Sequence, residues 1–94
     1  MKNDVFTNKE YLIYVSNEQN KVDAVKHMLI RRANFSDLRI LDHRTCCDDK
    51  YYVWRIQSWD AMWLSIKYSL RMFVHDGILS KDDIKIVNDY KEET

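Results

Sequence analysis

The chain has 94 residues, the size of one ordinary domain. Its 46% hydrophobic content excludes a disordered chain, because disordered chains lack the apolar surface that offsets the entropy of ordering. Fifteen basic and fifteen acidic residues give a formal net charge of zero, so no overall field steers the protein to nucleic acid or to an acidic membrane. There is one glycine, Gly77, and no proline, which excludes a phosphate-binding glycine loop.

The cellular location is predicted from the N-terminal residues, the longest apolar run and the two cysteines. Residues 1–10 contain no apolar core of a secretory signal, and the longest apolar run, five residues from Tyr11 to Val15, is far shorter than the roughly 20 that span a bilayer. Cys46 and Cys47 are neighbours, and neighbouring cysteines rarely bridge each other. We therefore predict a soluble, cytoplasmic protein without a membrane segment or disulfide. Abundant Asn, Asp, Lys, Ile and Tyr are typical of AT-rich genomes, including those of many phages, and favour a phage accessory protein.

The first third of the chain predicts a strand followed by a helix. Residues 10–15 are β-branched and aromatic without polar alternation, as in a strand that is central or covered on both faces. Ser16 and Gln19 have the spacing of a capping box, which predicts a helix that continues to about Ala33. One face of this helix is apolar and consists of Val22, Val25, Leu29 and Ala33, with Met28 beside them.

The middle of the chain predicts a hairpin and a second helix. Residues 38–41 and 51–56 have strand composition, and residues 48–50 form the turn between them. Ser58 is placed to cap a helix that ends near Asp76, with Gly77 as its left-handed terminator. The apolar stripe of this helix consists of Trp59, Met62, Trp63, Ile66, Leu70, Phe73 and Val74.

The end of the chain predicts a third helix. Ser80 and Asp83 match a capping box, with Asp in place of Glu, so a helix should run from Lys81 to about Tyr90 with Ile84, Val87 and Tyr90 facing inward. The order is then β-α-β-β-α-α. We predict one α+β domain over residues 1–94, with a lead-in at 1–9 and a frayed tail at 91–94. Its first two strands would be parallel, in a three-stranded mixed sheet with helices packed on one face.

Residues 42–48 bring together side chains that bind metals or act as nucleophiles. A structural zinc site could use His43 and Cys46, but such a site needs four ligands, and no second cluster exists because His27 and His75 are isolated. A nucleophilic pair of His43 with Cys46 or Cys47 would need oxyanion donors, and no glycine turn is available to supply them. We therefore predict no metal, no cofactor and no catalytic residue, and a protein that is not an enzyme.

A nucleic-acid-binding module is the alternative function. Residues 21–71 contain ten basic and six acidic side chains. Arg39, Tyr51 and Arg55 would lie on the sheet face away from the helices, where aromatic and arginine side chains can stack on single-stranded RNA. Against this, residues 50–55 lack the Gly and Phe of the RNA-recognition motif, the fourth strand of that fold is missing from the prediction, and residues 77–94 are acidic. The basic residues that would have to gather on one side are Lys21, Lys26, Arg31, Arg32, Arg39, Arg44, Arg55 and Arg71.

The helix predicted over residues 59–76 is apolar on a second face, opposite its core stripe. A helix with one buried side should carry charges there, but the positions hold Ala61, Leu64, Tyr68, Met72 and His75, with Arg71 at the flank. Either the other helices clamp this face inside the domain, or it contacts another chain.

Tyr and Met are enriched at interfaces, and a net charge of zero offers little protection against association. We therefore predict a small non-enzymatic regulator or inhibitor that occupies the surface of a partner protein. The same patch could pair with itself in a two-fold homodimer. The predicted protein-binding residues are Leu64, Tyr68, Arg71, Met72 and His75.

Overall fold

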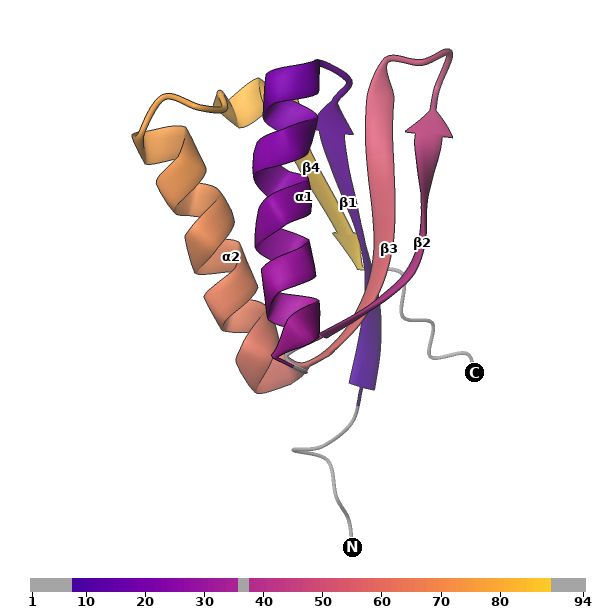
Figure 1. The fold of residues 1–94 in the computed structure, drawn as a ribbon, viewed down its shortest axis with the longest axis vertical. Coiled ribbons are helices and arrows are strands. Elements are labelled where there is room, and N and C mark those ends of the chain that lie inside the picture. Colours follow the sequence, from indigo (N-terminus) through magenta and orange to yellow (C-terminus); the bar gives the residue numbers. More distant parts are fainter. Residues whose placement is uncertain (1–7, 36–37, 89–94) are drawn as a thin grey trace, which may run out of the picture.

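The structure is a computed structural model that describes residues 8–35 and 38–88 (Figure 1). The strands and helices alternate as β-α-β-β-α-β, with a single 3-10 turn before the last strand. The elements are β1 (Asn8–Ser16), α1 (Gln19–Asn34), β2 (Leu38–Cys46), β3 (Tyr51–Trp59), α2 (Asp60–His75), a 3-10 turn (Lys81–Asp83) and β4 (Ile84–Asn88).

The four strands form one antiparallel sheet in the order β2-β3-β1-β4. The predicted α+β class is confirmed, but the predicted three-stranded mixed sheet is wrong. β1 and β2 do run in the same direction, as a helical crossover requires, yet β3 lies between them and pairs with both. This connectivity is the split β-α-β, or ferredoxin-like, arrangement, which many unrelated functions share.

The predicted third helix is wrong. A capping box does form, and the Ser80 backbone N–H donates to Oδ2 of Asp83 at 2.7 Å, but it starts only the 3-10 turn. The chain then enters β4, where Ile84 and Ile86 lie opposite the buried Val15 and Ile13 of β1. The segment therefore adopts a strand, in which side chains alternate with a period of two. The predicted helical face of Ile84, Val87 and Tyr90 does not form, and Tyr90 itself lies outside the described residues.

The core lies between the sheet and the two helices, which cover the same side of it (Figure 1). Along β1, alternate residues Tyr11, Ile13 and Val15 are buried. The ring of Tyr11 stacks on Trp63 of α2, with 3.9 Å between ring centroids. The helices contribute their predicted apolar faces, of which Val22, Val25, Leu29, Trp63, Ile66 and Leu70 are buried. Trp59 is 43% exposed, and its predicted place in the core stripe is wrong.

Both helices begin later than the sequence predicts, because the strands before them are longer. β1 continues through Ser16, so the N-cap of α1 is Glu18. β3 continues through Trp59, which is the N-cap of α2, and Ser58 is buried within the strand. The predicted end of α2 is confirmed by Gly77, whose φ of +82° is left-handed.

The turn between β2 and β3 lies where the sequence predicts it. Cys47, Asp48 and Asp49 have φ of 62°, 60° and 64°, and the Lys50 N–H donates to the Cys47 carbonyl oxygen at 3.2 Å. Asn17 holds this turn against the entry to α1, since its side-chain Nδ2 donates to the Asp49 carbonyl oxygen at 3.0 Å. The predicted lead-in is shortened because β1 begins at Asn8; the predicted tail at 91–94 lies outside the described residues.

Candidate functional site

The second face of α2 is exposed. Leu64 and Tyr68 are 65% and 62% exposed, so no other element of the described chain covers them. The interpretation that helices clamp α2 from both sides is wrong, because the segment expected to be the third helix is instead β4 and belongs to the sheet. Large side chains on this face therefore meet solvent, which is the condition for a contact with another molecule.

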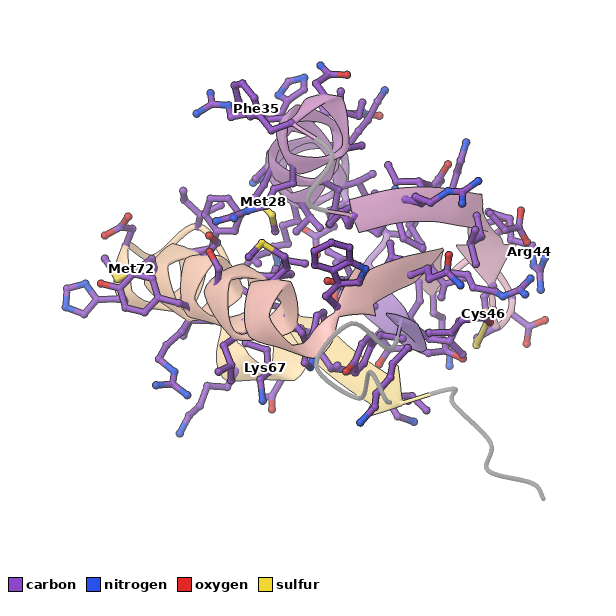
Figure 2. All side chains as sticks on the ribbon, turned by 90° about the horizontal axis from the view of Figure 1, so that it is seen from below. Met28, Phe35, Arg44, Cys46, Lys67 and Met72 are labelled. Atoms are coloured by element: carbon purple, nitrogen blue, oxygen red, sulfur yellow. A yellow bond between two sulfur atoms is a disulfide. The ribbon has the colours of Figure 1, made fainter. Side chains whose placement is uncertain are left out.

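Tyr68 and Met72 line a groove between α1 and α2 that we call the helix groove. Its volume is about 500 Å³. From α1 and its C-terminal cap, Met28 and Phe35 line the opposite wall, and Phe73 completes the apolar surface. Figure 2 shows Met28 between the two helices, with Phe35 and Met72 at the outer side of the molecule. The groove thus combines aromatic and thioether side chains, which contact surfaces favour.

The helix groove is lined by charged as well as apolar groups. Arg31 and Arg32 of α1 contribute two cations and His27 an imidazole, and Asp76 is the one carboxylate among the lining residues. Arg32 Nη2 donates to the Ser69 hydroxyl at 3.2 Å, which links the two helices across the groove. The groove therefore offers both apolar contact and hydrogen-bond donors to a partner.

The structure separates the five predicted protein-binding residues. Tyr68 and Met72 share the helix groove, and Leu64 lies exposed on the same helix. Arg71 instead lines a different groove, between α2 and β4. His75 is at the end of α2, where its Nδ1 lies 3.6 Å from the Asp76 carboxylate.

Phe35 is the residue that sequence reasoning missed. It caps the C-terminal end of α1 and is 73% exposed, the largest exposed fraction among the large hydrophobic side chains of the described chain. The sequence predicts a helix end near Ala33, two residues before Phe35, and the apolar face predicted for this helix does not include Phe35. An aromatic residue just beyond a helix end that already carries Arg31 and Arg32 was the available signal.

The sheet face away from the helices, which we call the outer sheet face, contains the three residues of the nucleic-acid alternative. The register pairs Arg39 with Gln57. Arg55 and Tyr51 lie two and six residues before Gln57, and therefore on the same side of β3. The Tyr51 ring packs edge-on against Tyr14 of β1 at 6.1 Å. The fourth strand, which the sequence-based argument considered missing, is present as β4.

Ion pairs within the outer sheet face reduce its positive charge. Arg55 Nε donates to Glu10 Oε1 at 3.0 Å, and Arg44 pairs with Asp42. The eight basic residues that a nucleic-acid-binding function would need on one side are divided between the helices and the sheet. Lys21, Lys26, Arg31, Arg32 and Arg71 belong to the helices, and Arg39, Arg44 and Arg55 belong to the sheet.

The candidate metal or nucleophile residues of segment 42–48 do not converge. The register pairs His43 with Trp54 and Cys46 with Tyr51, which lie on opposite faces of β3. His43 Nδ1 instead shares a hydrogen bond with the Tyr52 hydroxyl at 2.6 Å. Cys46 and Cys47 are joined by a disulfide, so the prediction that the two neighbours stay unbridged is wrong in this structure.

The most perturbed ionisable group is Asp83, and its role is structural. The Ser80 backbone N–H and the Lys21 ammonium both favour the charged carboxylate and hold the pKa of Asp83 well below its usual range. In return, the hydrogen bond to Asp83 raises the pKa of Lys21. Asp83 is buried, and these contacts fix the segment before β4 rather than form a reaction centre.

Comparison with protein-family models, with curated proteins and with solved structures finds no match to this chain. Neither helix, over the residues that the structure describes, is long and apolar enough to cross a membrane.

Proposed function

We propose that this protein is a small non-enzymatic regulator or inhibitor that binds a partner protein through the helix groove and the adjoining exposed face of α2. The observation that carries the proposal is the exposure of Leu64 and Tyr68 beside a groove of about 500 Å³. Burial of these apolar side chains against a partner would favour binding by roughly 25 cal/mol for each Å² of apolar surface removed from water.

Tyr68→Asp tests this proposal. A carboxylate in an interface without a partner costs several kcal/mol, whereas on the free protein it is solvated and leaves the fold intact. Wild type and Tyr68→Asp should therefore have the same circular dichroism and differ in binding. Lys50→Asp, at the exposed turn between β2 and β3, is a stringent control for added negative charge, because it lowers the net charge by two where Tyr68→Asp lowers it by one.

The readout is the set of proteins from the source cell that each variant retains, identified by mass spectrometry. We expect at least one protein to be retained by wild type and Lys50→Asp but not by Tyr68→Asp. Identical sets would contradict the proposal. Light scattering, which measures the molar mass in solution, covers the case in which the partner is a second copy of the chain. In that case wild type should be a dimer and Tyr68→Asp a folded monomer.

Single-stranded nucleic acid is a second candidate ligand, favoured by the side-by-side placement of Tyr14 and Tyr51 on the outer sheet face. Arg55 and, toward the other end of β3, Arg39 lie on the same face. Base stacking on such tyrosines contributes roughly 1–3 kcal/mol per base. If this candidate is correct, a labelled oligonucleotide should bind, weaken steeply with added salt and lose affinity in Tyr51→Ala. Salt-independent binding, or none, would exclude it and leave the protein partner.

A further inference from the structure

The two edges of the sheet differ in how open they are to another strand. β2 forms one edge, and its register with β3 is interrupted between Ile40 and Asp42. Such irregularities and charged side chains protect edge strands against further pairing. β4 forms the other edge and follows β1 without interruption from Ile84 to Asn88. Its one charged side chain, Lys85, lies over the Tyr14 ring, with 5.7 Å from Nζ to the ring centroid.

A groove of about 340 Å³ runs beside this edge, between β4 and α2. Its floor is apolar and includes Leu70, Val74, Ile84 and Ile86, of which Ile86 is 38% exposed. Lys67, Arg71 and Lys81 line its rim. Figure 2 shows Lys67 on the side of α2 that is turned away from α1 and toward β4.

The rim has an unbalanced positive charge. Lys67, Arg71 and Lys81 are all exposed, and no carboxylate is among the residues that line the groove. Within the part of the chain that the structure describes, none of the three forms an ion pair. The helix groove differs in this respect, because Asp76 lies among its cations.

We propose that β4 is a docking edge for an extended acidic segment of a partner protein, which adds to the sheet as a fifth strand. An edge strand supplies unpaired backbone N–H and C=O groups to such a segment. Side chains alternate along a strand, so every second residue of the partner would face the groove. Apolar residues at these positions would cover Ile86 and Val74, and carboxylates would meet Lys67, Arg71 and Lys81.

Charge selects this occupant over a second copy of the chain. Two-fold pairing of β4 with β4 of another copy would bring two identical cationic rims together, and like charges across an interface oppose association. Phosphates of a nucleic acid could satisfy the rim, but they would not form a hydrogen-bonded strand along β4. This docking edge is on the opposite side of α2 from the helix groove, so the inference does not depend on the proposed function.

The test uses two labelled peptides with capped ends and lengths matched to β4. The first peptide has the sequence Glu-Thr-Val-Thr-Glu, so that in an extended strand both glutamates and the valine lie on one side and the threonines on the other. The second peptide has lysine in place of each glutamate. Fluorescence anisotropy should show that the wild-type protein binds the glutamate peptide roughly tenfold or more tightly than the lysine peptide. The double variant Lys67→Glu, Arg71→Glu should reverse this order, because both residues are exposed on α2 and the fold is kept.

Hydrogen exchange decides whether the bound peptide is a strand. In the complex, amides of β4 should exchange more slowly than in the free protein, and Tyr68→Asp should bind the peptide as wild type does. Equal binding of the two peptides, no binding at millimolar concentration, or binding that leaves β4 exchange unchanged would each overturn the proposal. Slowed exchange in β4 that depends on protein concentration, without peptide, would assign the edge to a second copy and also overturn it.

Discussion

Lys21 Nζ lies 3.0 Å from Oδ2 of Asp83, so the first turn of α1 is tied to the segment that leads into β4. The same ammonium lies 3.3 Å from Glu18 Oε2, just before α1 begins. Asp83 also accepts the Ser80 backbone N–H at 2.7 Å. These contacts join parts of the chain that are distant in sequence, and they hold the segment before β4 against the first turn of α1.

Asp83→Asn should lower stability at neutral pH by about 1.5–3 kcal/mol, the range for hydrogen bonds to charged groups. Because the pKa of Asp83 is lowered on folding, its contribution is complete above the unfolded-state pKa of about 3.9 and is lost as the pH falls further, toward the lowered folded-state pKa. Urea unfolding over an acidic pH series should therefore show a steeper loss for wild type than for Asp83→Asn. Asp82→Asn, at an exposed neighbour, should keep the wild-type slope.

Leu70 and Leu64 lie on the same helix and allow a matched comparison. Leu70 is 2% exposed, and Leu70→Ala should cost about 2–5 kcal/mol. Leu64→Ala should stay within about 0.5 kcal/mol of wild type, as is usual for surface positions. Thermal or urea unfolding measures both. A large loss for Leu64→Ala would show that its face of α2 is packed within the domain.

Gly77→Ala should destabilise the protein by about 1–2 kcal/mol through backbone conformation alone. The φ of Gly77 is +82°, and a Cβ built there meets no atom within 4 Å, so steric clash with neighbours does not contribute. Gly77→Asn should cost less, because Asn tolerates the left-handed region. Equal losses for the two variants in urea unfolding would contradict this explanation.

Asp49→Gly should stabilise the turn between β2 and β3. Asp49 has a φ of 64°, in the left-handed region. Gly adopts this region without steric strain, whereas residues with a Cβ have a higher conformational energy there. A gain of about 0.5–1 kcal/mol in unfolding free energy is expected. Asp82→Gly is the control: no positive φ is found there, so Gly should bring no gain. If both variants lose stability, the turn does not limit the stability of the hairpin.

The sequence was most informative where one periodicity dominated. The stripe of Trp63, Ile66 and Leu70 has helical spacing only, and it predicted both a helix and its buried side correctly. Ile84, Ile86 and Val87 fit helical and alternating patterns about equally, and a nearby capping box favoured the wrong one. Only the pairing of this segment with β1 decides between them, and that pairing is not local in sequence.

The candidate site was predicted in part for the same reason. The residues on the second face of α2 follow from the periodicity of one helix, so Leu64, Tyr68 and Met72 could be named. Phe35 and Met28 join them only because α1 packs beside α2, and Arg71 is separated from them because β4 occupies the far side. Packing between elements, which a single sequence does not reveal, therefore completes the site.

The central position of β1 has a consequence for synthesis on the ribosome. Ile13 lies opposite Trp54 on one side and Ile86 on the other, and both partners emerge well after it. Translation adds roughly 5–20 residues per second, so β1 has no strand neighbour until β3 has been made. A nascent chain stopped before Ile84 would leave one side of β1 unpaired, because β4, which follows the other described strands in the sequence, covers this aggregation-prone edge.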